Sequence, residues 1–554
     1  MSHRSFITRA VVAGAAALSL AAPAATQPLP ADQRQLVDKV FAAYDKGDAP
    51  GCALAVFRSG EIAYARGYGL ASLEHRVPIT PATVFDIGST SKQFTAFSIL
   101  LLERDGKLSL DDDVRKHVPE LQPMDPAVTI RHLLLHTSGL RDYLTLWRLA
   151  GMKTENWTTQ ADAVRLAARQ RRGNFPAGAE WLYSNTGYLL LGEIVQRVSG
   201  QGLREFAAAR IFKPLGMTQT FFLDTHTEVI PARATGYVPR EGGGFSVDMS
   251  NFEQVGDGAV QTTVEDLLRW DSNFYEPKVG DRALLERAQA VGALANGRKL
   301  DYAAGLMIGS YRGLPMVRHG GAWAGYRAEL LRFPTARTSV ACLCNLGSTN
   351  PSALADSVAD IVLASQLAPK ADIASPDSRP AVPVPAGRLA SLAGFYENAA
   401  TGAFRRLTVK DGALVAQGQR LKPVAPDRFV PQAPGVEFHF PPAVAGGGQE
   451  MRVIRESRDP EVLRRVDPPT GANLAEFAGT YYSDELDATW TLAVRGGRLT
   501  VQVLTDPPSA LTAVKPDVFL SDEGLVLRFE REAGAVARAS VQAGRVTNLV
   551  FTRR

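Results

Sequence analysis

The residues best suited to chemistry stand at the start of an apolar helix. In FDIGSTSKQFTAFSILLLERDGKLSLD (residues 85–111), Ser89 and Lys92 precede a run that is almost wholly apolar. Residues three apart share one helix face, and a lysine amine in a partly dry site has a lowered pKa and can accept a hydroxyl proton. Backbone N–H groups at a helix N-terminus favour developing negative charge. The spacing therefore predicts Ser89 as nucleophile, Lys92 as its base and the Ser89 N–H as half of an oxyanion hole. The alternative is a serine cap followed by a solvated lysine.

Two further polar motifs also lie at the ends of predicted elements. Tyr183 and Asn185 come just before the apolar run GYLLLGEIVQRV, where a phenol could relay a proton and an amide could hold a substrate carbonyl. His319 ends a strand-like run and is followed by two glycines, the second being Gly321. Glycine permits close approach of backbone to a substrate, so the N–H of Ala322 would complete the oxyanion hole. Each motif has a structural alternative: an aromatic packing residue with an asparagine cap, and a buried strand histidine.

The hydrophobic pattern predicts that these motifs belong to an α+β domain. Two apolar runs around a Ser-Gly turn at 51–69 predict a hairpin. Helical segments dominate from about 125 to 300, and strand-like runs return between 302 and 345 before a last helix. This order predicts an antiparallel sheet flanked by helices with a helical subdomain, in which the first and last strands are neighbours. Within the helical part, TTVEDLLRW predicts a capping box between Thr262 and Glu265.

The rest of the chain reads as a linker followed by an internal repeat. The segment starting LAGFYENAATG at Leu392 matches the segment starting FAGTYYSDELD at Phe477, with Gly394 aligned to Gly479 and Tyr396 to Tyr481. Alternating apolar residues and glycine-containing turns predict two small all-β antiparallel barrels. The predicted domains are a signal peptide (1–24), a catalytic domain (28–366), a Pro- and Ala-rich linker (367–388), and first and second barrels (389–470 and 471–554).

Composition and charge exclude some classes of protein. The chain has 554 residues, of which 45% are hydrophobic and 21% charged, as in ordinary globular proteins. Its net charge is +4, and no block of basic residues suggests nucleic acid as a partner. A basic start, an apolar stretch from about Ala10 to Ala22 and a small-residue site at Ala24 predict a cleaved secretory signal and a secreted or periplasmic protein. The apolar stretch is shorter than a membrane span requires, so no stable span is expected.

Cysteine content predicts neither a disulfide scaffold nor a metal site. The three cysteines are Cys52, Cys342 and Cys344. An odd and small number argues against a disulfide framework. Cys342 and Cys344 alternate along a strand-like run and are predicted to pack as small hydrophobic residues, without the ligand spacing that zinc requires. We expect no metal and no cofactor.

Taken together, the three motifs resemble the signatures of the serine β-lactamase and penicillin-binding-protein superfamily: S-x-x-K, then Y-x-N, then a variant of K-T-G. The resemblance covers about residues 35–365, and TIRHLLLHTSGL and VQTTVEDLLRW are similar to the class C β-lactamase-like branch. Ser138 within HTSGL lacks the lysine and is interpreted as structural. The resemblance implies Ser89 as the acylated nucleophile, Lys92 and Tyr183 as base and proton relay, Asn185, His319 and Gly321 as substrate-binding residues, and the N–H groups of Ser89 and Ala322 as the oxyanion hole.

The third motif departs from the β-lactamase pattern, because His319 stands where that branch usually has lysine. A His-x-Gly motif and two C-terminal barrels are instead similar to D-aminopeptidases and some DD-peptidases. We expect an exported serine hydrolase acting through an acyl-enzyme on amide or peptide bonds of D-amino-acid substrates. The alternatives are a β-lactamase or small-ester carboxylesterase, and a non-catalytic binder or sensor. The expected partners are small peptide, amide, ester or β-lactam substrates and cell-wall peptides; the oligomeric state is left open.

The resemblance also bears on the barrels, since in D-aminopeptidases a barrel loop contributes to the substrate pocket. The second copy carries a five-residue insertion within VLTDPPSALTAV, which favours a loop from the second barrel lying over the Ser89 cleft. Asp506 in that loop would be placed to pair with a substrate ammonium. The alternative is that the barrels are spacers or wall-binding modules. On this interpretation a chain ending near residue 370 is expected to fold and still acylate.

Overall fold

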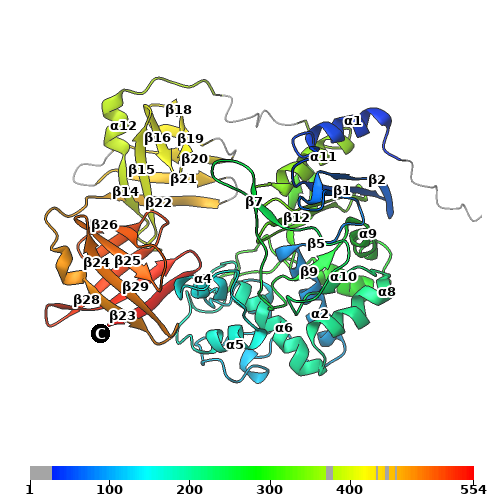
Figure 1. Cartoon of the computed structure of the whole chain (residues 1–554), viewed down its shortest axis with the longest axis horizontal. Helices are drawn as coiled ribbons and strands as arrows, with labels where there is room; N and C mark the ends of the chain where they lie inside the picture. The colour runs from blue at the N-terminus through cyan, green and yellow to red at the C-terminus, as the bar shows by residue number, and fades with distance from the viewer. Residues whose placement is uncertain (1–27, 370–378, 432–434, 443–447, 456–457) are drawn as a thin grey trace, which may run out of the picture.

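The computed structural model describes residues 28–369, 379–431, 435–442, 448–455 and 458–554 (Figure 1). The predicted signal peptide and the middle of the predicted linker lie outside these residues. Among the helices that are described, none combines the length and the apolar character that crossing a membrane would need.

A six-stranded antiparallel sheet forms the centre of the N-terminal domain, in the order β10-β11-β12-β13-β1-β2. The predicted pairing of the first and last strands is confirmed, because β1 lies in register with β13 and joins the early hairpin to the late strands. The strands are β1 (Cys52–Arg58), β2 (Glu61–Tyr68), β10 (Met307–Tyr311), β11 (Leu314–Trp323), β12 (Tyr326–Phe333) and β13 (Thr338–Cys344).

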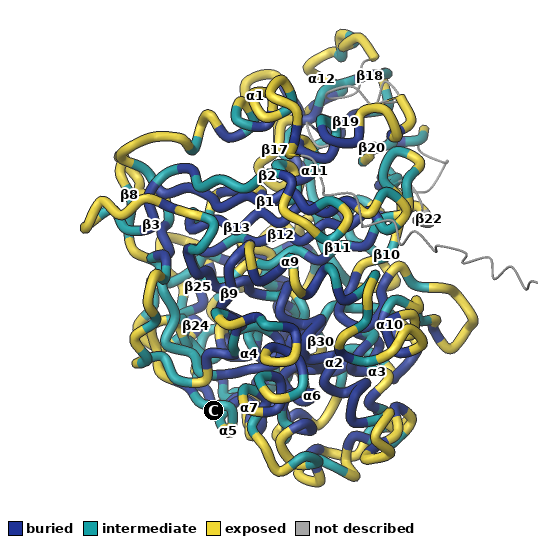
Figure 2. The backbone as a smooth tube through the Cα atoms, turned by 90° about the vertical axis from the view of Figure 1, so that its right-hand side faces the viewer, coloured by how far each residue is buried: buried dark blue, intermediate teal, exposed yellow. Residues whose placement is uncertain are grey.

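Helices cover both faces of this sheet, and the alternation of β1 side chains separates two cores. Leu54 and Val56 pack with α1 (Ala31–Val40) and α11 (Pro351–Val362), whereas Ala53 and Ala55 face the helical subdomain. In that subdomain α2 (Lys92–Arg104) is buried along its length to Leu102, as its apolar sequence requires, while α1 is largely exposed (Figure 2). The other helical elements are η1 (Gly88–Ser91), η2 (Val114–Lys116), α3 (Ile130–Leu134), α4 (Tyr143–Leu149), α5 (Gln160–Ala168), α6 (Asn185–Ser199), α7 (Leu203–Ala207), η3 (Ala208–Phe212), α8 (Lys213–Leu215), α9 (Val264–Asn273) and α10 (Arg282–Ala288).

Short strand pairs connect these helices. The pairs are β3 with β4, β5 with β9, β6 with β9, and β7 with β8. Their bounds are β3 (Leu70–Ser72), β4 (Val77–Pro78), β5 (Phe85–Asp86), β6 (Phe221–Phe222), β7 (Tyr237–Pro239), β8 (Phe245–Val247) and β9 (Val260–Thr262).

The N-cap of α9 differs from the predicted capping box by one residue. Thr263 is the cap, and its hydroxyl accepts a hydrogen bond from the backbone N–H of Asp266. Thr262 is instead the last residue of β9, where it pairs with Phe85 and its hydroxyl meets that of Thr220. The prediction of a capping box between Thr262 and Glu265 was therefore wrong, because strand β9 includes Thr262 and the helix cap moves to Thr263.

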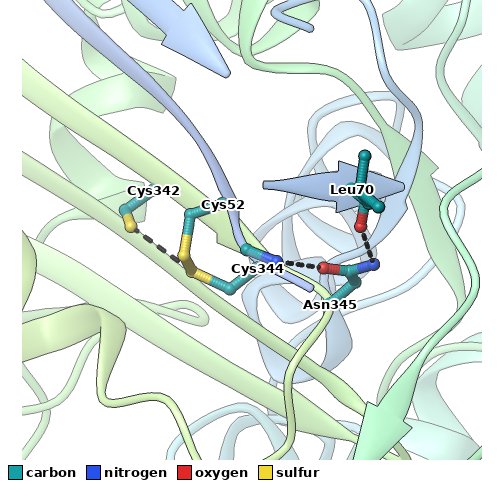
Figure 3. The surroundings of a disulfide bond; sticks show 6 residues. Cys52, Leu70, Cys342, Cys344 and Asn345 are labelled. Atoms are coloured by element: carbon teal, nitrogen blue, oxygen red, sulfur yellow. Dashed lines mark hydrogen bonds between the residues drawn. A yellow bond between two sulfur atoms is a disulfide. The ribbon is translucent and has the colours of Figure 1, made fainter. Parts of the chain in front are cut away.

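The interpretation of the cysteines is corrected in part by a disulfide between Cys52 and Cys344 (Figure 3). These residues face each other across β1 and β13 with a Cα–Cα distance of 4.0 Å, although 292 residues separate them in the chain. Cys342 is the buried free cysteine, with its sulfur 3.7 Å from that of Cys344. All three sulfurs lie within 4.8 Å of one another, a clustering that spacing along the sequence did not reveal.

The first C-terminal unit is a nine-stranded antiparallel sheet that curls until its ends meet. Its edge strands β17 and β18 are separated by a single residue of chain. The preceding helix α12 (Ala386–Leu392) begins inside the range predicted as linker. The strands are β14 (Gly394–Glu397), β15 (Phe404–Lys410), β16 (Ala413–Ala416), β17 (Gln419–Arg420), β18 (Lys422–Ala425), β19 (Arg428–Val430), β20 (Val436–His439), β21 (Glu450–Arg455) and β22 (Arg458–Val466).

The second C-terminal unit is a closed eight-stranded barrel, preceded by η4 (Leu474–Phe477). The repeat is visible in its details. Gly394 and Gly479 have φ angles of 143° and 147°, and the hydroxyls of Tyr396 and Tyr481 each donate to the carbonyl four residues earlier. The strands are β23 (Gly479–Ser483), β24 (Ala488–Arg495), β25 (Arg498–Val503), β26 (Ser509–Lys515), β27 (Val518–Ser521), β28 (Val526–Glu532), β29 (Ala535–Ala543) and β30 (Val546–Arg553).

This second barrel packs directly against the helical subdomain, beside α4 and α5 (Figure 1). Tyr143, Leu146 and Trp147 of α4 share one buried cluster with barrel residues, and the Trp490 indole donates to the carbonyl of Leu149 at 2.8 Å. Arg141 is fully buried in the interface and pairs with Glu485 at 2.8 Å. A chain ending near residue 370 would leave this surface uncovered, which argues against the expectation that such a chain folds normally.

Candidate active site

Ser89 is held in a short turn that Asp86 shapes. The Asp86 carboxylate accepts a hydrogen bond from Gly88 N–H at 2.7 Å, and its other oxygen accepts one from Gln261 at 2.9 Å. Gly88 has a φ of 48°, a left-handed conformation that glycine adopts without strain. The chain then turns through η1 into α2, so that Ser89 is partly exposed between two buried neighbours.

Lys92 is completely buried and its amine points at Ser89. The Nζ atom lies 3.2 Å from Ser89 Oγ, 2.9 Å from Asn185 Oδ1 and 2.5 Å from the carbonyl oxygen of Asp257. A neutral amine has two N–H groups and one lone pair. Asn185 and Asp257 offer only acceptor oxygens and take two N–H groups, so in the neutral amine the lone pair is left facing the serine hydroxyl. The predicted pair of nucleophile and base is therefore brought together in a geometry suited to proton transfer.

Strand β11 lies against η1, and glycines make this approach possible. A Cβ on Gly321 would lie 1.8 Å from the carbonyl oxygen of Ile87, and one on Gly88 would lie 2.7 Å from the nitrogen of Ala322. The Thr90 hydroxyl adds a hydrogen bond to the carbonyl of His319 at 3.1 Å. Ser89 and Ala322 thus line the same cleft, while the absence of a side chain at Gly321 makes room for the Ile87 backbone.

His319 is buried and both of its ring nitrogens have partners within the protein. Nδ1 lies 2.7 Å from the carbonyl of Gly320, which can only accept, so Nδ1 carries the proton and Nε2 accepts from the Tyr302 hydroxyl at 3.0 Å. Burial, reinforced by the charge of Lys92, lowers the pKa of His319 to about 4, so the ring is neutral at pH 7. His319 lines the cleft, but both of its ring nitrogens are engaged within the protein.

Tyr183 stands beside this group with its phenol oxygen buried. Among the described residues no partner hydrogen-bonds this oxygen. Its ring packs against His136 with centroids 4.2 Å apart, and Lys92 Nζ lies 4.9 Å from its centroid. The structure brings Tyr183 next to Lys92 without the hydroxyl contact that the resemblance suggests, so a relay through it requires a substrate group or a water to bridge.

Asn185 is positioned by a network that sequence reasoning missed. Its backbone N–H donates to Asp142 Oδ2 at 2.8 Å, and its side-chain oxygen accepts from Lys92. Asp142 also caps α4 through Thr145. Asp257, whose carbonyl binds Lys92, has a side chain that accepts from the Tyr143 hydroxyl at 3.1 Å. Burial raises the pKa of Asp257 to about 6 despite the opposing charge of Lys92.

The cleft around Ser89 has two lobes that share Ser89, Asn185 and Ala322. The lobe that we call the Asp257 lobe is lined by Asp86, Tyr143, Leu223, Arg233, Phe252, Asp257 and Tyr326, among others. The lobe that we call the Arg545 lobe is lined by Tyr183, Met307, Arg318, His319, Gly321, Arg327, Glu329 and Arg545, among others.

The second barrel does reach the cleft, but through a different loop from the one expected. The β29–β30 turn carries Arg545, which lines the cleft with its guanidinium 4.7 Å from the Tyr183 ring centroid. Asp506, in the loop with the insertion, instead pairs with Lys153 at 2.9 Å beyond the end of α4. The proposed role of Asp506 toward a substrate ammonium does not fit this position. A two-residue turn with a single arginine gave no signal in the sequence.

Comparison with known proteins is consistent with this site. Residues 37–365 match the family described as Beta-lactamase. A D-aminopeptidase of Gluconobacter oxydans (strain 621H) is 28% identical over 529 residues, covering 91% of this chain and 96% of the relative. The octameric penicillin-binding protein homologue from Pyrococcus abyssi superposes with a TM-score of 0.56 at 22% identity, over 86% of this chain and 98% of its own. A D-amino acid amidase from Ochrobactrum anthropi SV3 superposes with a TM-score of 0.51 at 24% identity, and the match covers 60% of this chain and 99% of the amidase. The last two show a shared fold. With more than half of its length matched by the family, and with the fold and motif order of that family, this chain belongs to the Beta-lactamase family.

Proposed function

We propose that the protein is an exported serine hydrolase that forms an acyl-enzyme at Ser89 with amides and peptides of D-amino acids. The observation that carries this proposal is the position of the Lys92 amine, 3.2 Å from Ser89 Oγ with two carbonyl acceptors for its remaining protons. A structural lysine would be expected to form an ion pair, and the groups that hold this one are neutral oxygens.

Acylation begins with transfer of the Ser89 hydroxyl proton to the neutral Lys92 amine as Oγ bonds to the substrate carbonyl carbon. The carbonyl oxygen becomes an oxyanion between the N–H groups of Ser89 and Ala322, which β11 holds together. The C–N bond then breaks, and the leaving nitrogen receives the proton from Lys92 through Tyr183 or a bridging water.

Deacylation uses the same groups in reverse. A water takes the place of the leaving nitrogen, gives a proton to the Lys92 amine and attacks the ester carbonyl, and Ser89 recovers its proton when the ester bond breaks. The Tyr183 phenol is buried and without a hydrogen-bond partner among the described residues, and its ring centroid lies 4.9 Å from Lys92 Nζ, so it would join this proton path through a bridging water or substrate group.

The preference for D-residues draws its support from the relatives. The D-aminopeptidase of Gluconobacter oxydans aligns over 96% of its own length and 91% of this chain, which extends well beyond the catalytic domain. The third motif supports the same choice, because His319 is buried and neutral where a β-lactamase of the class C branch has lysine. Export rests on the predicted signal at residues 1–24 and makes the secreted or periplasmic location part of this proposal.

The test compares enantiomers and detects the adduct. D-alanine p-nitroanilide is expected to be hydrolysed at least about tenfold faster than the L-form, with nitrocefin and p-nitrophenyl acetate as poor substrates. Intact-mass measurement after treatment with a phosphonate should show one adduct, absent from Ser89→Ala. Ser138→Ala is the matched control, since within the described part of the chain the Ser138 hydroxyl accepts from Leu140 N–H and has no other partner. An adduct in Ser89→Ala, or equal rates on both enantiomers, would overturn the proposal.

A further inference from the structure

The turn between β29 and β30 gives Arg545 a fixed position in the cleft. Ala543 pairs with Val546, so Gly544 and Arg545 form a two-residue hairpin turn, with Gly544 at a φ of 52°. Tight turns of this kind hold their side chains in defined directions because the strands fix both ends. A residue at such a tip is presented to the neighbouring domain with little freedom of the backbone.

Residues of the catalytic domain form hydrogen bonds with the backbone of this turn. The Arg545 carbonyl accepts from Asn174 Nδ2 at 3.0 Å and from Asp142 N–H at 3.4 Å. Arg141 donates to the carbonyls of Thr547 and Asn548 at 2.9 and 2.6 Å. These contacts use main-chain atoms, so they locate the Arg545 side chain without occupying it.

The N–H groups of the Arg545 guanidinium remain available to bind a ligand. Its side chain is 41% exposed, and its ion pair with Asp142 is 3.6 Å long, beyond hydrogen-bond distance. The Asp142 carboxylate already accepts from Asn185 N–H and from the N–H and hydroxyl of Thr145. Among the described residues, no acceptor hydrogen-bonds the Arg545 side chain.

The two lobes differ in charge. Arg318, Arg327 and Arg545 line the Arg545 lobe with Glu329 as the opposing carboxylate, and Glu329 is paired with Arg318 at 2.9 Å. The Asp257 lobe instead has Asp86 and Asp257 with Arg233. A substrate ammonium is therefore disfavoured in the Arg545 lobe, and a carboxylate is favoured there.

We infer that Arg545 binds a carboxylate on the leaving part of the substrate, so that the preferred substrates are D-residue peptides with a free C-terminal carboxylate. This inference rests on the proposed function, because Tyr183 lines the Arg545 lobe and a leaving nitrogen that receives a proton by way of Tyr183 must leave on that side. Arginine suits the task, since its planar fork can hold both oxygens of a carboxylate.

The experiment measures binding and turnover separately. In Ser89→Ala, calorimetry compares D-Ala-D-Ala with its C-terminal amide, and the acid is expected to bind at least about tenfold tighter. Adding Arg545→Gln should remove that difference and leave binding of the amide unchanged. In the protein with Ser89 intact, Arg545→Gln should raise KM for the acid about tenfold or more with little change for the amide. Arg148→Gln is the matched control: an exposed arginine on α4 near Gly544 that does not line the cleft.

Three outcomes overturn the inference. Equal binding of acid and amide by Ser89→Ala would show that no carboxylate site exists. An equal loss for both ligands in Arg545→Gln would mean that the residue only supports the fold. A shifted pH profile with unchanged selectivity would mean that Arg545 acts on the Tyr183 phenol. Failure of the proposed function would look different: carboxylate preference in binding, without turnover or a Ser89 adduct.

Discussion

The ability of Lys92 to act as a base depends on how many hydrogen-bond acceptors surround its amine. The amine meets three oxygens, and only the Ser89 hydroxyl can give up a proton. An ammonium in the same place would donate to all three and leave the serine without a base. Proton transfer from Ser89 therefore requires the amine to reach its neutral form.

The first prediction concerns the base and the relay. Lys92→Ala and Tyr183→Phe are each expected to lower the acylation rate about 10²-fold or more, because each removes a positioned proton carrier. Rapid-mixing measurement of acyl-enzyme formation is the assay. Lys153→Ala, which removes an exposed lysine paired with Asp506, is the control and should keep the full rate. Normal acylation in both variants would make the S-x-x-K spacing a coincidence.

The second prediction concerns pH and stability. Burial holds the pKa of His319 at about 4, below the value near 6.5 expected in the unfolded chain. Between these values the unfolded state binds a proton that the folded state does not, so the free energy of unfolding contributed by His319 falls as pH decreases from about 6.5 to 4. Asp257, whose pKa is raised to about 6, contributes with the opposite sign. The difference between wild type and His319→Asn isolates the histidine.

The measurement is urea unfolding of both proteins across that pH range. As pH decreases through this range, the free energy of unfolding of the wild type should fall by up to about 1.4 kcal/mol per pH unit more than that of His319→Asn. Parallel curves for the two proteins would show that the ring is not held neutral by the fold.

At this scale the sequence identified the motif residues but not their partners. Ser89, Lys92, Tyr183, Asn185, His319, Gly321 and Ala322 gather at one cleft. The first four stand where helices begin, whereas β11 continues to Trp323, so His319 lies inside the strand and the prediction that it ends a strand was wrong. Tyr302, Asp142 and Asp257 were missed. Each acts through a contact with a residue far away in the chain, and no local pattern marks such a contact.

At the scale of elements, the active site depends on how closely β11 lies against η1. The two are connected through Gly88 and Gly321, where any side chain would collide with the opposing backbone. The sequence predicted the strand, the helix and the importance of the glycines. It predicted that the glycines let a substrate approach the backbone, whereas in the structure Gly321 lets the Ile87 backbone approach. Strand order and register decide which backbone faces Gly321, and these follow from the whole sheet.

The third prediction tests this contact. In Gly321→Ala the new Cβ would lie 1.8 Å from the Ile87 carbonyl oxygen, so β11 must move away from η1. The N–H groups of Ser89 and Ala322 then separate, and kcat is expected to fall about 10²-fold, as when one oxyanion donor is lost. Gly309→Ala, on neighbouring β10, meets only Met316 at 3.5 Å and should be nearly silent. Equal activity of the two variants, with both folded, would remove the oxyanion hole from this place.

At the scale of the whole molecule, the sequence predicted the internal repeat but not how the second barrel packs against the catalytic domain. The shared glycine and tyrosine positions predicted two similar β units, and both adopt the same local geometry. Which barrel loop meets the cleft depends on how Arg141, Trp490 and the α4 cluster fix the orientation of the barrel. The inserted loop was the visible difference between the copies, yet it contacts the chain near Lys153.

The last prediction tests whether the barrel and the catalytic domain act as one body. Arg141 has a fully buried side chain that pairs with Glu485 and also holds the backbone after Arg545. Glu485→Gln leaves this guanidinium buried without its anion, which is expected to cost about 3–5 kcal/mol in the free energy of unfolding. The hairpin should loosen at the same time, and discrimination by the cleft between carboxylate and amide substrates should fall. Glu461→Gln is the control, because Glu461 pairs at 2.8 Å with Arg405 inside the first unit, where both side chains keep partial exposure. Denaturant unfolding and kcat/KM for the acid and amide are measured on both variants. If Glu485→Gln matched Glu461→Gln in stability and kept its selectivity, the second barrel would be an independent body that merely lies beside the cleft.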